Sequence, residues 1–568
     1  MPGLDALRSE FGPAEGDRSA DGLPTSAARS RSASIGTWSL LARRRCLAEP
    51  RQIECERAVA RVRDRDQMLP PDRPGPRRPH AGARRGAGAY VIVWELHRHY
   101  VIRVGARHED AKASYAALRA AHLHAVRAAL EDHVARVDWP VDRIEHYRTE
   151  RLRALLHHAR ARSPFHAARM KGFDPASSTV ADLARLPPMV KQEAQDEWDA
   201  IVTERGLDRA EAERILAEQS WFSYTPSGSQ VFSSGGSSGV RGVYVWAWEL
   251  FVTLACLAWR MQVRDERSGR PRDGARGPMR LAVLEAGEPP HASTPLFDVA
   301  TDPRMRTVVI PAAAPFEQVL SALAAVRPTH LVGYASVIGR LARAAIAGEL
   351  DIDPVRVSTN SEPLSEEDDE AIRTAWGATI HNLWGSTEIG VQAVGCGQGD
   401  GLHVCEDEVV LERVDESGDP VAADEPAART LATGLANTTF PFIRYDLGDE
   451  VTLLPGCCPC GSSLVRVAAI AGRRDDDFRY GEGTIPASAF RHALGTDPRI
   501  SEYQVRQTAS GAEVLVVGNP DSPVLTASLV AALRPYGLTD ADISVTQVAR
   551  IDRHASTGKL KRFVALGD

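Results

Sequence analysis

From residue 281 onward the sequence alternates short apolar runs with helix-like runs, and this alternation narrows the folds that the chain can adopt. Residues 281–284, 307–310 and 330–333 have the length and composition of buried strands. Residues 316–326 and 337–347 have the apolar spacing of helices. Strands that alternate with helices form sheets that helices cover, so we expect an α/β fold.

The size and composition of the chain fit a large globular enzyme. It has 568 residues, of which 43% are hydrophobic and 25% are charged. The net charge of −7 argues against a nucleic-acid partner, which calls for a basic face. The longest apolar run, residues 250–259, is too short to cross a bilayer, and no secretory segment follows Met1. We therefore expect a soluble cytoplasmic protein without a membrane partner.

The N-terminal part differs in composition from the rest. Residues 1–90 are rich in Arg, Pro, Gly and Ser, and we expect them to be disordered because they cannot bury enough apolar surface. The alternatives are a basic arm that binds an acidic partner and a translation start further downstream. Residues 91–142 form an uncertain lead-in, and helix-rich ordered sequence is expected from residue 143, with a first helix over 143–162.

Lysine is rare in this chain. Only five of the 68 Lys and Arg residues are lysines, and one of them, Lys559, follows the flexible sequence Ser556-Thr557-Gly558. Where arginine supplies nearly every positive charge, such a lysine suggests that a compact ammonium is needed at that place. A solvated tail is the alternative.

A loop of serine and glycine, residues 233–239, follows the apolar pair Val231-Phe232. Small residues let backbone N–H groups and hydroxyls approach phosphate oxygens, and Arg241 adds charge. No Gly-Lys-Ser/Thr follows, so the loop is not a Walker-type P-loop, which disfavours an ordinary kinase or motor ATPase. A flexible linker is the alternative.

Later segments have the residue types that bind the rest of a nucleotide. Residues 382–390, Asn-Leu-Trp-Gly-Ser-Thr-Glu-Ile-Gly, offer an aromatic ring for adenine, together with hydroxyls and a carboxylate for phosphate and Mg²⁺. Residues 444–449 and 472–477 offer carboxylates for ribose hydroxyls and arginines for phosphate. Each segment alone could be an ordinary turn or a surface charge cluster.

Together and in this order, these segments resemble the adenylate-forming superfamily of acyl-CoA synthetases and ligases, and specifically its phenylacetate-CoA ligase-like branch. The resemblance spans about three quarters of the chain, residues 143–563. It implies a large multi-sheet α/β body over residues 143–474. It also implies a small mobile α+β domain over residues 475–568, which carries the catalytic lysine.

The resemblance further implies a role for each matching residue. ATP would contact Ser233, Ser234, Gly235, Gly236, Ser237, Ser238, Gly239, Ser361, Glu362, Pro363, Trp384, Gly385, Ser386, Thr387, Asp449 and Arg473. Asp449 matches the ribose-binding aspartate, Glu388 supports Mg²⁺, Lys559 is the catalytic lysine, and Asp475 is the interdomain hinge. Tyr334 resembles a residue at the edge of the substrate pocket.

Two positions depart from the pattern of this family. Val240-Arg241 replaces the lysine that usually follows the last glycine of the phosphate loop, and Arg241 keeps the charge. Asn360 stands where a glycine is common, which could reshape the acyl pocket.

An aromatic series follows the Ser/Gly loop. Its spacing is compatible with one long helix, and we expect its members to pack in the core rather than line an acyl pocket: Tyr244, Trp246, Trp248, Phe251 and Trp259.

One group of cysteines has the residue types of a metal site. Cys396, His403, Cys458 and Cys460 offer three thiolates and an imidazole for tetrahedral Zn²⁺, and Cys457 could replace Cys458. Similar clusters occur in relatives of this branch. We expect a structural zinc site, and a set of free thiols is the alternative.

The implied reaction is the ATP-dependent and Mg²⁺-dependent activation of a carboxylic acid as an acyl adenylate, followed by thioester formation with coenzyme A. One alternative passes the acyl group to an amine or a carrier-protein thiol. The alternative from another class is a non-catalytic, zinc-stabilised scaffold that binds nucleotide.

Overall fold

The computed structural model describes residues 106–566, except for residues 220, 235–240, 268–278, 288, 298–304, 423–424, 426, 450, 469, 471–475, 482, 496, 498 and 555–557. The segment expected to be disordered, residues 1–90, lies outside the described residues. So do residues 235–239 of the Ser/Gly loop, Arg473 and Asp475. Among the described residues, no helix has both the length and the apolar character needed to cross a bilayer.

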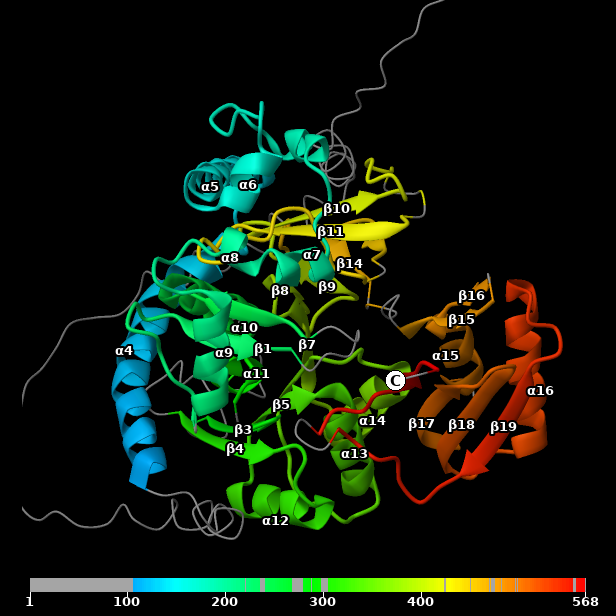
Figure 1. Ribbon diagram of the computed structural model, residues 1–568. Coiled ribbons are helices and arrows are strands. Elements are labelled where there is room, and N and C mark those ends of the chain that lie inside the picture. Colours follow the sequence, from blue (N-terminus) through cyan, green and yellow to red (C-terminus); the bar gives the residue numbers. More distant parts are fainter. Residues whose placement is uncertain are drawn as a thin grey trace, which may run out of the picture. The chain divides into compact units, whose positions relative to one another are not determined.

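The largest sheet has nine strands and contains the predicted α/β unit (Figure 1). Five neighbouring strands run parallel in the order β4-β3-β5-β6-β7, with the bounds β3 Arg280–Glu285, β4 Arg306–Pro311, β5 His330–Tyr334, β6 Arg356–Asn360 and β7 Thr379–Ser386. Antiparallel strands continue the sheet beyond β7, namely β8 (Gly390–Val394), β9 (Leu402–Val404), β14 (Arg466–Val467) and β13 (Leu453–Leu454).

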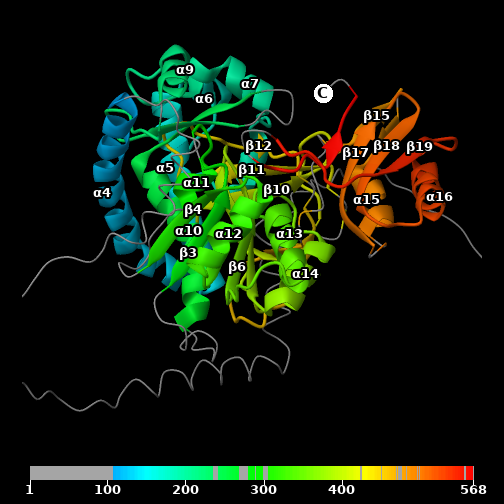
Figure 2. The same ribbon diagram turned by 90° about the horizontal axis from the view of Figure 1, so that it is seen from below.

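Helices cover both faces of the parallel strands (Figure 2). The helices on one face are α12 (Phe316–Val326), α13 (Ala335–Ile346) and α14 (Glu366–Trp376), and α10 (Trp248–Arg267) and α11 (Ser293–Phe297) lie on the other face. Because successive side chains of a strand point to opposite faces, Leu281 and Val283 pack with α10, whereas Ala282 and Leu284 pack with α12 and α13. The predicted strands and helices of this region are confirmed.

The body begins earlier than the sequence indicated. Helix α4 (Ala106–Arg136) falls within the lead-in at residues 91–142 and packs along α10. Its residues Val126, Leu130 and Val134 are buried in the same core as α10. The described part of the lead-in therefore belongs to the body.

Smaller sheets and helices complete the body. Strands β1 (Gln230–Ser233) and β2 (Val243–Trp246) pair with each other on either side of the Ser/Gly loop in the sequence, and a three-stranded sheet contains β10 (Val409–Val414), β11 (Arg429–Gly434) and β12 (Tyr445–Asp446). Helices and helical turns precede the hairpin: α5 Val141–Arg162, α6 Pro164–Arg169, η1 Val180–Arg185, α7 Lys191–Asp196, α8 Trp198–Ile201 and α9 Arg209–Glu218.

The aromatic series after the Ser/Gly loop does not form one helix. Tyr244 and Trp246 lie on β2, and the helix begins only at Trp248. Aromatic residues at every second position from 244 to 248 have the spacing of a strand. In so short a run this spacing is also compatible with part of a helix. The expected core position is confirmed for Tyr244, Trp246, Phe251 and Trp259, which are buried.

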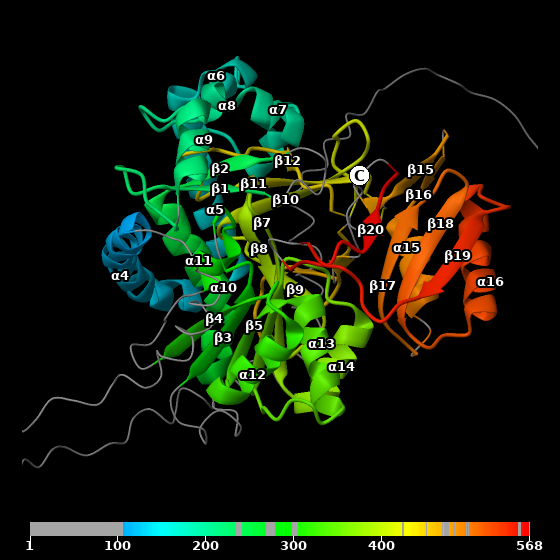
Figure 3. The same ribbon diagram turned by 60° about the horizontal axis from the view of Figure 1, so that its bottom comes forward.

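The C-terminal part has α+β composition and its own core (Figure 3). A four-stranded sheet has the order β19-β18-β17-β20, with the bounds β17 Ile500–Gln507, β18 Gly511–Gly518, β19 Asp542–Gln547 and β20 Phe563–Val564. The hairpin of β15 (Phe478–Tyr480) and β16 (Gly483–Ile485) precedes it, and the helices here are α15 (Ala487–Gly495), α16 (Ser522–Leu533) and η3 (Arg534–Tyr536).

Candidate active site

Three polar side chains end adjacent parallel strands. Glu285 ends β3, Tyr334 ends β5 and Asn360 ends β6, and all three are buried. Asn360 Nδ2 donates to Glu285 Oε1 at 2.8 Å, and the backbone N–H of Ala286 donates to the Tyr334 hydroxyl at 3.0 Å. The carboxyl edge of parallel strands is where α/β sheets bind their ligands.

Lys559 lies at this edge. Its Nζ is 5.0 Å from the centroid of the Tyr334 ring. The turn around it is closed by two backbone hydrogen bonds, from His554 N–H to Lys559 O at 2.9 Å and from Gly558 N–H to His554 O at 2.8 Å. The structure therefore brings the predicted catalytic lysine to the predicted pocket residue Tyr334.

The charge of Lys559 acts on two titratable groups, the buried Glu285 and the partly buried His291. Burial raises the pKa of the Glu285 carboxyl to about 7, although the hydrogen bond from Asn360 and the charge of Lys559 lower it. Burial, with a smaller effect of the Lys559 charge, lowers the pKa of His291 to about 4. The strand edge thus holds an ammonium, a buried carboxyl and a neutral imidazole close together.

The base of the Ser/Gly loop is a closed hairpin. The backbone N–H of Ser234 donates to Gly242 O at 3.0 Å, and the N–H of Gly242 donates to Ser234 Oγ at 3.1 Å. Ser233, the last residue of β1, donates its N–H to Pro290 O at 3.0 Å. The hairpin therefore starts the loop next to the segment that follows β3.

Glu388 joins three of the predicted motifs. Its Oε1 accepts hydrogen bonds from the hydroxyl of Tyr244, at 2.7 Å, and from the hydroxyl of Tyr445, at 3.2 Å. Trp246 Nε1 also donates to Thr387 O at 2.9 Å. Tyr244 follows the Ser/Gly loop and Tyr445 belongs to the segment 444–449, so the three segments meet at one carboxylate.

Asp449 and Trp384 are paired inside the molecule. Trp384 Nε1 donates to Asp449 Oδ2 at 2.8 Å, and the two residues are 7% and 4% exposed. Trp384 is buried in the same core as Val243 and Val245 of β2, whereas Gly385, Ser386 and Thr387 are partly exposed.

The segment after β6 contacts the Lys559 turn. Ser361 has a positive φ of 63°, and its Oγ donates to Asn360 Oδ1 at 2.7 Å. The Glu362 carboxylate accepts backbone N–H groups from Ser336 and Leu560. Pro363 is exposed.

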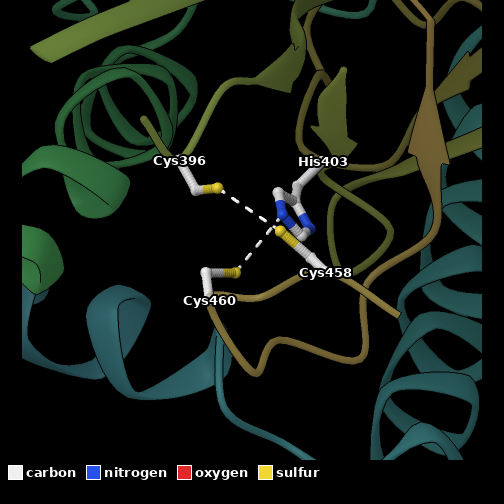
Figure 4. Close-up of side chains that lie close together, drawn as sticks. All are labelled: Cys396, His403, Cys458 and Cys460. Atoms are coloured by element: carbon white, nitrogen blue, oxygen red, sulfur yellow. Dashed lines mark hydrogen bonds between the residues drawn. The ribbon is translucent and has the colours of Figure 1, made fainter. Parts of the chain in front are cut away.

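The predicted metal ligands form one group (Figure 4). The ligand atoms of Cys396, His403, Cys458 and Cys460 all lie within 4.8 Å of one another. Cys396 Sγ is 3.5 Å from Cys458 Sγ, and Cys460 Sγ is 3.4 Å from His403 Nε2. Cys458, and not the exposed Cys457, belongs to the group.

The donor set fits zinc. Sulfur ligands around tetrahedral Zn²⁺ stand about 3.8 Å apart, given Zn–S bonds of about 2.3 Å. Hydrogen bonding between the thiols of Cys396 and Cys458 lowers the pKa of Cys396 and raises the pKa of Cys458, so Cys396 is the thiol of this pair that ionises more readily. A Cβ on Gly399 would lie 2.8 Å from Cys458 Sγ, so the chain closes tightly around the group.

Tyr244, Tyr445 and Glu285 were not predicted as site residues. Tyr244 belonged to the aromatic series expected in the core, and Tyr445 stood unremarked beside the arginine and the aspartates of its segment. Glu285 ends a predicted strand, and a charged residue at that position was the available signal.

Comparisons with known proteins support the predicted resemblance. No family model matches the chain. Phenylacetate-coenzyme A ligase of Thermus thermophilus is 28% identical over 150 residues. The matched part covers 26% of this chain and 34% of that protein, so it spans about a third of the relative's length.

Solved structures of 2-hydroxyisobutyryl-CoA ligase in the postadenylation state share the fold. Two complexes, with R3-HIB-AMP and with 2-HIB-AMP, match with TM-scores of 0.59 and 0.58. Each is 18% identical and covers 76% of this chain and 91% of the solved chain. The chain therefore has the fold of an acyl-CoA ligase, and its resemblance to adenylate-forming ligases of the phenylacetate-CoA ligase-like branch is confirmed.

Proposed function

We propose that the protein activates a carboxylic acid with ATP as an acyl adenylate and then forms a thioester with coenzyme A. The observation that carries the proposal is the position of Lys559, whose ammonium lies against Tyr334 at the carboxyl edge of the parallel strands. The similarity to two acid:CoA ligases supports the same reaction.

The chemistry of this reaction explains why a lysine is needed. The substrate carboxylate attacks the α-phosphorus of ATP, displaces pyrophosphate and needs no base, because it is already an anion. Two anions approach each other, so the protein must supply positive charge at the reacting phosphorus. Lys559 supplies a compact point charge that can contact both anions.

The remaining residues would hold the nucleotide. The Ser/Gly loop would bind the phosphates with its N–H groups and hydroxyls, and Asp449 and Arg473 would bind on the ribose side. Because the Trp384 ring lies in the core, we assign the contact along adenine and the α-phosphate to the partly exposed residues 385–387.

Glu388 would hold the Mg²⁺ that accompanies ATP. The hydroxyls of Tyr244 and Tyr445 orient its carboxylate by donating to Oε1. A carboxylate oxygen is the ligand type that Mg²⁺ prefers. The ion would neutralise phosphate charge next to the Ser/Gly loop.

We assign Zn²⁺ to the group of Cys396, His403, Cys458 and Cys460. The four ligands would fill a tetrahedral coordination sphere, so the metal would be structural. Reduced thiols of this kind agree with a cytoplasmic location. We also retain Asp475 as the hinge of a mobile C-terminal domain, since the run 472–477 is polar.

The test is acid-dependent exchange of labelled pyrophosphate into ATP. Wild-type protein should catalyse exchange with at least one acid of a panel that includes phenylacetate and 2-hydroxyisobutyrate. Lys559→Ala should lower the exchange rate about 100-fold or more, because one electrostatic contact to the transition state is lost. Lys171→Ala, which removes an exposed lysine, serves as the matched control.

Hydroxamate trapping detects the acyl adenylate, and AMP release measured without hydroxylamine, with and without coenzyme A, identifies the acceptor. Acyl adenylate that turns over only when coenzyme A is added supports thioester formation. Turnover with an amine or a carrier protein would support the alternative ligase, and absence of exchange with every acid would favour the scaffold.

A further inference from the structure

Glu362 ties the Lys559 turn to the body. Its Oε1 accepts the backbone N–H of Leu560 at 2.9 Å, and its Oε2 accepts the backbone N–H of Ser336 at 3.1 Å. Ser336 lies in the first turn of α13, two residues after Tyr334. The Glu362 carboxylate therefore joins Leu560, which follows Lys559, to helix α13. This helix begins directly after Tyr334, whose ring lies against the Lys559 ammonium.

Gly558 fixes the other side of the turn. A Cβ at this position would lie 2.5 Å from the carbonyl carbon of Ala312 and 2.6 Å from the nitrogen of Ala313. Its φ of +73° is also a conformation that side chains disfavour. Lys559 is thus held on one side by a close backbone approach and on the other by a carboxylate.

Two arginines extend this contact. Arg553 Nη1 donates to Ser336 Oγ at 2.8 Å, while its Nη2 pairs with Glu502 of β17. Arg562 Nη2 lies 3.3 Å from Oδ2 of Asp368 on α14. Residues on both sides of the turn therefore contact the body, Arg553 at α13 and Arg562 at α14.

We propose that Glu362 is a positioning residue for carboxylate activation, which fixes the Lys559 turn at the strand edge and does not bind the nucleotide. The proposal rests on the proposed function, since it needs Lys559 to act in adenylate formation. Both Glu362 oxygens accept backbone N–H groups in this arrangement, and the proposal gives Glu362 this role in place of the nucleotide contact expected from the sequence.

The Lys559 turn must be anchored because the lysine side chain is flexible and loses conformational entropy when its ammonium is held at one point. A lysine ammonium at the end of four rotatable bonds reaches one point reproducibly only when its backbone is anchored. Thioester formation from finished acyl adenylate brings no second anion to phosphorus, so it does not need the anchored lysine. Loss of Glu362 should therefore slow one half-reaction and spare the other.

The experiment measures the two half-reactions separately in the full-length protein. Pyrophosphate exchange reports activation, and thioester formation from synthetic acyl adenylate and coenzyme A reports the second step. Glu362→Ala should lower the kcat of exchange about 30-fold, because a turn without its anchor places the Lys559 ammonium at the phosphorus less often, with the KM for MgATP nearly unchanged. Its rate of thioester formation should stay within about twofold.

Matched variants separate positioning from a general defect. Glu362→Gln keeps one acceptor oxygen and should recover part of the rate, and Glu366→Ala, at an exposed glutamate nearby, should behave as wild type. Gly558→Ala should reproduce the selective loss. Gly537 has a similar φ of +89°, and nothing lies within 4 Å of a Cβ added there. Gly537→Ala should therefore leave both half-reactions unchanged.

Equal losses in both half-reactions, an unchanged exchange rate in Glu362→Ala, or a raised KM for MgATP as the main effect would each overturn the proposal. The proposed function fails separately, if wild-type protein exchanges pyrophosphate with no acid or if Lys559→Ala exchanges as fast as wild type. Exchange that depends on Lys559 and not on Glu362 would refute only the positioning role.

Discussion

Glu285 brings a carboxyl into a buried environment at the candidate active site. Its pKa in the folded protein is about 7, because burial outweighs the hydrogen bond from Asn360 and the charge of Lys559, whereas its ordinary value is 4.5. Between these two pH values the folded protein keeps a proton that the unfolded chain releases. The free energy of unfolding therefore falls as the pH rises from about 4.5 to about 7.

This pH dependence can be measured by urea unfolding of wild-type protein and Glu285→Gln. Wild type should lose about 3 kcal/mol of unfolding free energy across this pH range relative to Glu285→Gln, which has no titrating carboxyl there. Glu366→Gln, at an exposed position, should track wild type at every pH. Parallel curves for wild type and Glu285→Gln would show that Glu285 is ionised in the folded protein.

Single residues of the site were predictable where the chemistry is local. Glu388 stood out because it follows an aromatic, a glycine and two hydroxyls in one short segment. Its partners Tyr244 and Tyr445 did not, because their contact depends on how β2, β7 and β12 meet in space. A sequence pattern carries the composition of a motif but not the long-range hydrogen bonds that orient it.

At the scale of elements, the cysteine group joins separate parts of the large sheet. Cys396 follows β8, His403 lies on β9, and Cys458 and Cys460 lie in the turn between β13 and β14. These strands are short, with two or three residues in β9, β13 and β14, so ladder hydrogen bonds alone hold them weakly. Zinc would bind the turn to the sheet.

Metal content and thermal unfolding test this assignment. We expect about one zinc per purified chain by elemental analysis, and Cys396→Ser should lose the metal and melt roughly 10 °C lower. Cys457→Ser, next to the group but exposed, should keep both the metal and the melting temperature. Full zinc content in Cys396→Ser would remove this residue from the ligand set.

Elements were predictable where the apolar period was unambiguous. Helix α12 has the predicted bounds, residues 316–326, because its apolar positions recur with helical spacing and Arg327 ends it in a left-handed conformation. The series from Tyr244 to Trp259 was assigned wrongly, because aromatic residues every second position fit a strand as well as part of a helical face. The antiparallel strands β13 and β14 have two residues each, which is too short for an alternation of apolar and polar residues to be recognised in the sequence.

At the scale of the whole molecule, the ordered body includes α4 and so starts before residue 143, where the sequence analysis placed its first helix. Residues 91–142 contain no chemical motif, and α4 has little amphipathic contrast because both apolar and charged groups contact the body. Arg136 pairs with Glu408, while Val126, Leu130 and Val134 pack with α10. Only the assembled core shows that this helix is part of the fold.

Two shortened chains test the revised boundary. A chain that starts at residue 106 should keep pyrophosphate exchange and the urea midpoint of the full-length protein. A chain that starts at residue 141 should be unstable, since each buried aliphatic side chain of α4 contributes about 2 kcal/mol and domains are stable by only about 5–15 kcal/mol. Cooperative unfolding of the chain from residue 141 at the full-length midpoint would contradict this expectation.

The aligned ends of β3, β5 and β6 limit how the candidate active site can be redesigned. Side chains alternate between the faces of a strand, so one residue inserted into any of the three strands would turn its terminal group away from its neighbours. Exchanging Glu285, Tyr334 or Asn360 for another side chain leaves that alignment intact. An engineered library should therefore vary residue identity at these positions at constant strand length.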